Sequence, residues 1–266
     1  MANYDRMAGA TLADRQFEEL RQAELYDAHN GETIEAGRDD FAFYLPLILA
    51  ADSVLDVGCG TGALLGLARA GGHRGRLTGI DPAAGMLTIA RERTDIEWIQ
   101  GTVEETDLEE TFDLVVMSGH AFQVLVTDEE LTTAIGAISR ALKPGGMFAF
   151  ETRNPAARAW ERWTPEHPWH FIVDGQPGTY TAEVEGPIKG GVVSFGSWYH
   201  RSDWSAAEYS RSTLRFLEAS ELADHLGQND LCIEAQFGDW DRSPLEAASP
   251  EIITLARKPE AIRPRG

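Results

Sequence analysis

The chain of 266 residues lacks several features that define common protein classes. It has only two cysteines, which excludes a disulfide framework and leaves no cysteine-rich zinc motif. No apolar run reaches the roughly 18 residues that span a bilayer, and the first residues do not form a secretory signal. We therefore expect a cytoplasmic protein without a membrane partner. No cluster has the spacing of metal ligands, so no metal site is predicted.

Positive charge is also scarce. There are 23 lysines and arginines against 43 acidic residues, which gives a formal net charge of −20. The field of such a protein repels a phosphate backbone, so a DNA or RNA substrate is disfavoured. The acidity is compatible with a cationic small molecule, but it also serves simply to keep a protein soluble.

The most informative motif present is the segment 54–62, Val-Leu-Asp-Val-Gly-Cys-Gly-Thr-Gly. An apolar strand ends with Asp56 and breaks into Gly58, Gly60 and Gly62. Glycine adopts positive φ and lets the backbone approach a ligand closely, so the segment predicts a tight turn around a bound molecule. It also fits the loop of a nicotinamide-dependent oxidoreductase. Asp56 argues against that alternative, because a carboxylate repels a pyrophosphate and attracts a cation.

This segment resembles the nucleotide-binding loop of the class I methyltransferases that use S-adenosylmethionine (SAM). The similarity continues in order over residues 40–155 and resumes at 215–257. It implies an α/β fold with a doubly wound, seven-stranded, mostly parallel sheet of the Rossmann-like methyltransferase type. A module or partner subunit that binds SAM without transferring methyl stays open as a further alternative.

The resemblance implies cofactor contacts at the next two strand ends. Asp81 ends the second strand and is expected to bind the ribose hydroxyls, although Asp81 before Pro82 is also a good helix N-cap. Met86 would lie against the adenine or in the core. Thr102 stands where many relatives carry an aspartate for the adenine amine, and Val103 would offer its backbone N–H to the ring.

The turn after the fourth strand, residues 118–123, faces the methionine part of SAM and the methyl acceptor in the family. His120 is therefore the candidate catalytic residue, either as a general base or as a positioning group. Tyr26 would cover the carboxylate end of the cofactor or pack in its helix. The predicted cofactor contacts are Tyr26, Asp56, Gly58, Cys59, Gly60, Gly62, Asp81, Pro82, Met86, Thr102, Val103, Ser118, Gly119 and His120.

The following helix has clear end signals. Thr127 and Glu130 have the spacing of a capping box, and apolar residues then recur at helical intervals up to Leu142. We expect the Lys-Pro-Gly-Gly segment 143–146 to end this helix and reverse the chain before a fifth strand at 147–151.

From about residue 156 the pattern changes. Five of the seven tryptophans lie between residues 160 and 204, and period-two alternation replaces helical periodicity. This predicts an antiparallel insertion of three or four strands between the fifth and sixth core strands, with domain boundaries 1–155, 156–216 and 217–266. The insertion should overhang the carboxyl ends of the parallel strands, where open sheets bind ligands, as a substrate lid or a homodimer surface.

Three further residues are expected on this rim. Arg153 and Asn154 follow the fifth strand and Trp240 follows the sixth, and we predict that they contact the acceptor. The predicted reaction is methyl transfer from SAM to a small molecule, with S-adenosylhomocysteine as the second product. It should need no metal and rely mainly on positioning.

Overall fold

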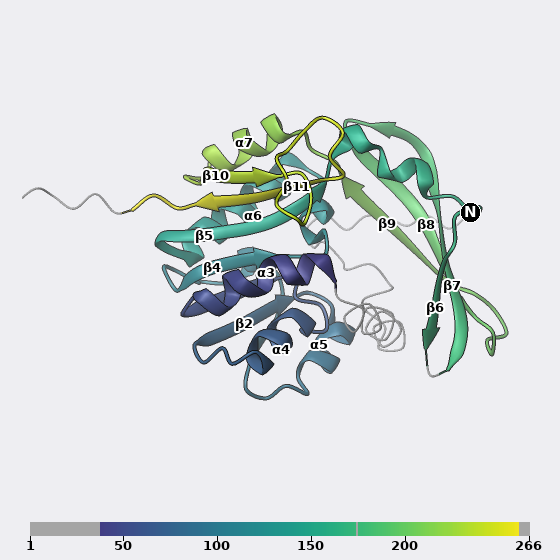
Figure 1. Ribbon diagram of the computed structural model, residues 1–266, viewed down its shortest axis with the longest axis horizontal. Coiled ribbons are helices and arrows are strands. Elements are labelled where there is room, and N and C mark those ends of the chain that lie inside the picture. The colour runs from purple at the N-terminus through teal and green to yellow at the C-terminus, as the bar shows by residue number, and fades with distance from the viewer. Residues whose placement is uncertain (1–37, 174, 261–266) are drawn as a thin grey trace, which may run out of the picture.

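The computed structural model describes residues 38–173 and 175–260 and contains two sheets (Figure 1). The larger sheet has seven strands in the order β10-β11-β5-β4-β1-β2-β3. Its strands are β1 (Ser53–Val57), β2 (Arg76–Asp81), β3 (Glu97–Gln100), β4 (Phe112–Met117), β5 (Leu142–Arg153), β10 (Cys232–Phe237) and β11 (Glu251–Arg257). The strands from β1 to β5 pair in parallel, while β11 is antiparallel to both β5 and β10. The predicted fold class is confirmed.

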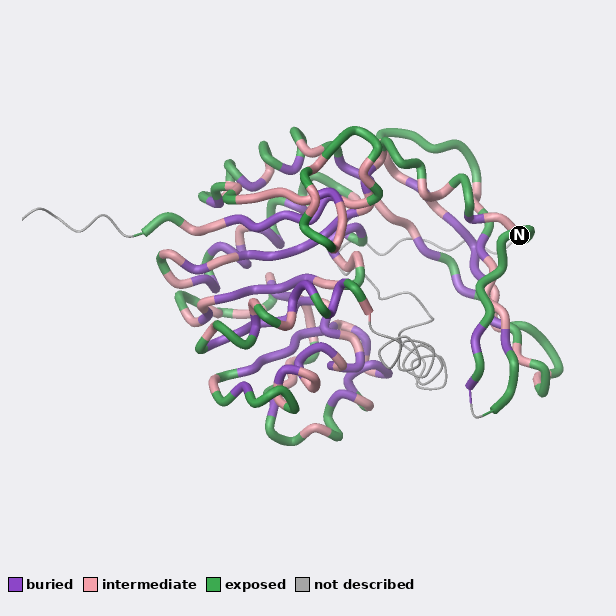
Figure 2. The backbone as a smooth tube through the Cα atoms, in the orientation of Figure 1, coloured by how far each residue is buried: buried purple, intermediate pink, exposed green. Residues whose placement is uncertain are grey.

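Helices cover both faces of this sheet. They are α3 (Asp39–Ala50), α4 (Ala63–Ala70), α5 (Ala84–Ala90), α6 (Asp128–Ala141) and α7 (Ala219–Gly227). Apolar residues of α3 and α4 pack on one face, and those of α6 and α7 pack on the other. Figure 2 shows the buried segments following the central strands between these two layers.

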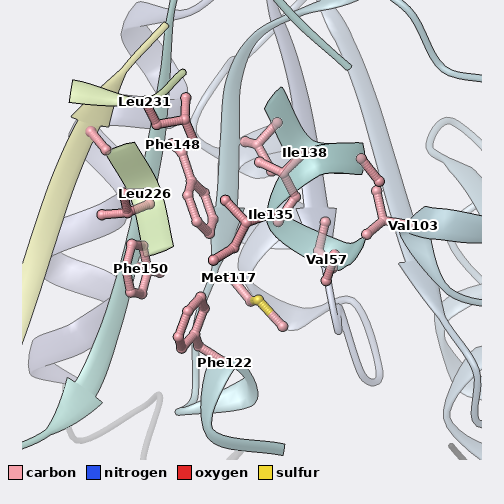
Figure 3. Close-up of a cluster of buried hydrophobic side chains, with 14 of the residues drawn as sticks. Val57, Val103, Met117, Phe122, Ile135, Ile138, Phe148, Phe150, Leu226 and Leu231 are labelled. Carbon is pink, nitrogen blue, oxygen red and sulfur yellow. The ribbon is translucent and has the colours of Figure 1, made fainter. Parts of the chain in front are cut away.

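The predicted capping box starts α6. Thr127 Oγ1 accepts a hydrogen bond from Glu130 N at 3.1 Å, and Glu130 Oε2 accepts one from Thr127 N at 2.8 Å. These bonds satisfy backbone groups that the first helical turn leaves unpaired. The buried side of α6 then lies over β4 and β5, where Ile135 and Ile138 meet the strand residues (Figure 3).

The expectation for residues 143–146 was wrong in one respect. The helix ends at Ala141 as a Pro-Gly sequence favours, but residues 142–146 form the first part of β5 rather than a reversing turn. Gly145 N donates to Lys258 O and Lys258 N donates to Gly146 O, both near 3 Å. Pairing with the segment after β11 therefore satisfies backbone groups that an isolated turn would leave to water.

The smaller sheet is the insertion, and it lies between β5 and β10 in the chain. Its order is β6-β7-β8-β9, all antiparallel, so the predicted insertion has four strands. The strands are β6 (Trp169–Val173), β7 (Gln176–Lys189), β8 (Val192–Arg201) and β9 (Glu208–Arg215), preceded by the 3₁₀ turns η3 (Pro155–Ala157) and η4 (Ala159–Arg162). In Figure 1 the insertion stands beyond the end at which β5 leaves the larger sheet.

A buried glutamine ties the insertion to the core. Gln123 lies in η2 (Ala121–Val124), just after β4, and has no exposed surface. Its Nε2 donates to Arg215 O at 3.1 Å, and its Oε1 accepts from Arg153 Nη1 at 3.0 Å. Arg215 also forms an ion pair with Asp128 at 2.7 Å. The insertion is thus held against the turn that carries His120.

The aromatic stack of the core gives a stability prediction. Phe148 is fully buried, and its ring lies 4.6 Å from that of Phe150 (Figure 3). Phe148→Ala should lower the free energy of unfolding by about 3–5 kcal/mol, because it removes apolar contacts and leaves a cavity. Urea unfolding measures the change. Leu49→Ala, at a position 41% exposed, is the control and should cost less than about 1 kcal/mol; equal losses would contradict the assigned core.

Candidate cofactor and acceptor site

The glycine loop between β1 and α4 has the conformation that its sequence predicts. Gly58, Gly60 and Gly62 have φ values of 74°, 54° and 75°, a region that side chains disfavour. A Cβ on Gly58 would lie 2.9 Å from Ala121, and one on Gly62 would collide with the ring of Trp98. A Cβ on Gly60 would meet no described atom within 4 Å. Two of these glycines are required by packing, and Gly60 presents bare backbone.

Asp81 fixes this loop against the end of β2. Its Oδ2 accepts a hydrogen bond from Gly60 N and its Oδ1 accepts one from Ala83 N, both at 2.8 Å. The expected N-cap role is wrong, because α5 begins at Ala84 with Ala83 as its cap, and Pro82 lies before the helix. The Asp81 carboxylate therefore connects the glycine loop after β1 with the segment after β2 instead of capping a helix.

Asp56 is the buried acid at the end of β1. Its side chain is 1% exposed, and Oδ1 finds no hydrogen-bond partner among the described residues. Burial raises its pKa to about 8, and the nearby negative charges of Asp81 and Glu151 contribute in the same direction. A buried carboxylate without a partner is costly, and an adjacent cation would remove the cost.

Cys59 lies between these glycines and is buried. Its backbone N and that of Gly58 donate to Ile80 O, at 3.2 Å and 2.8 Å. Burial raises the pKa of its thiol, so the side chain is a packed apolar group rather than a nucleophile. Its contribution to a ligand would come from the backbone of the loop.

The residues expected near the adenine follow β2 and β3. Met86 and Val103 are each 2% exposed, and Thr102 precedes the 3₁₀ turn η1 (Val103–Glu105). Thr102 N donates to Glu105 Oε2 at 2.9 Å, so this backbone group already has a partner. The contacts of these three residues with adenine stay a prediction. Tyr26 lies outside the described residues.

The turn after β4 is held by an acid that the sequence analysis missed. Glu151 is fully buried near the end of β5. Its Oε1 accepts a hydrogen bond from His120 N at 2.6 Å, and its Oε2 accepts one from the hydroxyl of Tyr44. Burial raises the pKa of this carboxyl. The signal was present in the sequence, since Glu151 ends an apolar strand just as Asp56 and Asp81 do.

Ser118 and Gly119 open this turn, and His120 completes it in the left-handed conformation, at φ 61°. Gly119 is exposed, and a Cβ there would meet nothing within 4 Å among the described residues. The bond from His120 N to Glu151 fixes the turn, and the next residue, Ala121, packs close to Gly58.

The ring of His120 contacts a second acid that the sequence analysis missed. Its Nε2 lies 3.1 Å and 3.0 Å from the two carboxylate oxygens of Glu251, the first residue of β11. Burial and the nearby charge of Arg153 lower the pKa of His120 to about 3, so the ring is neutral near pH 7. Burial raises the pKa of Glu251 to about 8. Of this pair, Glu251 is the group that titrates near neutral pH.

The three predicted acceptor contacts differ in what their side chains already bind. The Asn154 side chain is buried and already hydrogen-bonded, because Oδ1 accepts from Ala156 N at 3.1 Å and Nδ2 donates at 2.8 Å to Ser249 O in the segment before β11. Arg153 donates to Gln123 and lies 5.6 Å from the ring centroid of Trp163. Asn154 therefore has a structural role that a bound acceptor would have to disrupt.

Trp240 packs at the other side of the rim. Its ring meets those of Phe43 and Tyr44 edge-on, at centroid distances of 6.0 Å and 6.2 Å. These contacts anchor the loop between β10 and β11 against α3, and they lie next to the Tyr44–Glu151 hydrogen bond. A direct contact of Trp240 with an acceptor stays a prediction.

Residues 38–173 and 175–260 contain no group of three or more His, Cys, Asp or Glu residues that could hold a metal ion. No helix in these ranges has the length and apolar character needed to cross a membrane.

The fold defines a class of protein, the open α/β sheets whose strand order changes direction between β1 and β4. In such sheets the carboxyl ends of the strands at this position are where ligands generally bind. Residues 54–146 match the family model of the methyltransferase domain. The match spans about a third of the chain, from β1 to the start of β5, and includes the glycine loop.

Several proteins with similar sequences or structures are methyltransferases. The cypemycin N-terminal methyltransferase of a Streptomyces species is 35% identical over 105 residues, which cover 39% of this chain and 43% of that protein. The match thus spans less than half of this relative. The CcbJ methyltransferase of Streptomyces caelestis has a similar structure, with a TM-score of 0.71, 20% identity and coverage of 92% of this chain and 98% of the other. The amino pentose methyltransferase CalS10 of Micromonospora echinaspora also has a similar structure. Its TM-score is 0.65 and its identity is 22%, and the alignment covers 86% of this chain and 95% of the other.

The buried acid Asp56 gives a prediction on pH and stability. In the unfolded chain its carboxyl ionises near pH 4, whereas in the folded protein its pKa is about 8. Between these values the folded state keeps a proton that the unfolded state has released, so raising the pH favours unfolding. Relative to wild type, Asp56→Asn should gain up to about 1.4 kcal/mol of stability per pH unit across this window.

Urea unfolding of the ligand-free protein at several pH values measures this difference. The exposed residue Asp107 supplies the control variant Asp107→Asn, whose difference from wild type should not follow the same trend. A stability difference for Asp56→Asn that stays constant with pH would show that Asp56 is ionised in the folded protein.

Proposed function

We propose that this chain is an enzyme that transfers the methyl group of SAM to a small-molecule acceptor. The single observation that carries the proposal is the unsatisfied, buried carboxylate of Asp56 beside a left-handed glycine loop. SAM bears a sulfonium and an ammonium but no phosphate. Positive charge near Asp56 would therefore be stabilised, and a pyrophosphate would be repelled.

The residues present fit this cofactor. Bare backbone at Gly60 allows close approach, and Asp81 supplies carboxylate oxygens for ribose hydroxyls. Asp56 keeps its proton up to about pH 8 in the ligand-free protein, and a cation beside it would favour its ionised form. When bound, SAM supplies a methyl group already activated by the positive charge on its sulfur. The acids at this rim make the nicotinamide alternative less favourable, because a pyrophosphate would be repelled by Asp81 and would find no positive charge at Asp56.

The chain's own contribution to the reaction is then mainly positioning. The Glu151–His120 hydrogen bond fixes the turn after β4, and the Gln123 contacts hold the insertion against that turn. This arrangement supports in-line alignment of an acceptor and exclusion of water from the reacting atoms. We further propose that no metal takes part, because the methyl group needs no Lewis acid for its activation.

The acceptor is proposed to be a small molecule rather than a nucleic acid. The net charge of −20 supports this choice, and the related proteins include enzymes named for a peptide N-terminus and an amino pentose. Two free cysteines, Cys59 and Cys232, are consistent with the proposed cytoplasmic location. A homodimer through the insertion stays a proposal.

Cofactor binding is tested at Asp81. Asp81→Ala should weaken SAM binding on the order of 10- to 100-fold, because it removes charge-assisted hydrogen bonds and releases Gly60 N. Isothermal titration calorimetry measures the affinity, and Asp107→Ala serves as a matched surface control. Unchanged affinity in Asp81→Ala would refute the assigned role of this carboxylate.

Methyl transfer itself is tested by the release of S-adenosylhomocysteine from SAM. The purified protein should release it with at least one member of a panel of amines, phenols and carboxylic acids, and EDTA should leave the rate unchanged. SAM binding without release for any of these acceptors would favour the alternative of a non-catalytic SAM-binding module. Loss of the rate with EDTA would contradict metal independence.

A further inference from the structure

The contact between His120 and Glu251 joins residues 131 positions apart in the chain. Glu251 uses its backbone to pair with Arg153 of β5, so strand pairing does not require its carboxylate. That carboxylate faces the His120 ring at 3.0–3.1 Å, and the two side chains keep 13% and 20% of their surface exposed. The pair therefore lies at the rim of the sheet with access from outside the core.

Charges around Glu251 come from three other elements besides the His120 turn. Arg153 on β5 lowers its pKa, whereas Asp239 after β10 and Asp40 on α3 raise it, and burial is the largest effect. His120 is neutral near pH 7 and contributes no positive charge. Asp40 forms an ion pair with Arg38. An ionised Glu251 would stabilise a cation bound beside its carboxylate.

We propose that Glu251, oriented by His120, binds the amino group of the acceptor, so that the chain methylates small-molecule amines at nitrogen. This inference rests on the proposed methyltransferase function. His120 is assigned as a positioning residue, since a ring that resists protonation is a poor base near pH 7. Glu251 is assigned as the group that meets the ammonium and takes its proton.

The proposed step balances in atoms and charge. An ammonium acceptor gives one proton to the carboxylate of Glu251 and becomes a neutral amine with a free lone pair. That nitrogen forms a bond to the methyl carbon of SAM while the carbon–sulfur bond breaks, and the electron pair of that bond stays on sulfur. The products are the methylated ammonium and S-adenosylhomocysteine, and the proton on Glu251 passes to water.

The test uses the full-length protein saturated with S-adenosylhomocysteine and follows the ring protons of His120 by NMR at a pH near 8. Ethylammonium chloride should shift the His120 signal in a saturable manner, and ethanol, its neutral counterpart, should not. In Glu251→Gln the apparent affinity for ethylammonium should fall on the order of 10- to 100-fold. The exposed acid Glu246, in the same loop, provides the control Glu246→Gln, which should respond like wild type.

The outcomes separate this inference from the proposed function. Calorimetry should give the same affinity for S-adenosylhomocysteine in wild type and in Glu251→Gln, which also shows that the variant folds. If the wild type binds S-adenosylhomocysteine but ethylammonium leaves the His120 signal unmoved, or if Glu251→Gln responds as wild type does, the amine site is refuted. If the wild type binds no S-adenosylhomocysteine, the proposed function fails first.

Discussion

Electrostatic repulsion among buried carboxylates at one rim of the sheet is the constraint on which this site depends. Parallel strands bring their carboxyl ends to the same edge, so acids at the ends of β1, β2 and β5 converge there. Asp56, Asp81 and Glu151 are all buried at this edge. Hydrogen bonds from backbone groups and from Tyr44 satisfy part of this charge, but Asp56 keeps an oxygen without a partner. A positively charged ligand bound at this edge would offset the repulsion.

Packing keeps this charged rim open to a ligand. The ring of Trp98 fills the space that a side chain on Gly62 or Gly79 would need. The indole therefore packs directly against the glycine loop. Trp98 is itself held, because its Nε1 donates to Arg93 O at 2.9 Å. The loop's conformation is thus supported by the packing of Trp98, which lies on β3, against Gly62 and Gly79. Such preorganisation lowers the entropic cost of binding.

Much of the fold could be predicted from the sequence because its signals are local. Apolar runs that end in an acid mark β1 and β2, the Thr127–Glu130 capping box marks the start of α6, and period-two alternation marks the insertion. The glycine loop was recognisable for the same reason. The predicted reversal at 143–146 failed because the partner of this segment lies after β11, more than 100 residues further on.

The missed parts of the site also depend on distant pairing. Glu151 could have been recognised from its place at a strand end, but its bond to His120 N follows from the fold of the turn after β4. Glu251 gave no such signal, because it begins an antiparallel strand whose register decides what its carboxylate faces. Similarly, the hydrogen bond from the Asn154 amide to Ser249 O joins two segments 95 residues apart, and the sequence gives no local signal for it.

The position of β11 has a consequence for biosynthesis. This strand is the penultimate one in the order of the sheet but the last to leave the ribosome, and it pairs with β5 on one side and β10 on the other. Until it is inserted, the nascent chain exposes an unpaired edge along β5, next to an insertion able to form its own hairpins. The same late event carries Glu251 to His120, so a ribosome-bound intermediate can have a complete glycine loop and still lack the contact between His120 and Glu251.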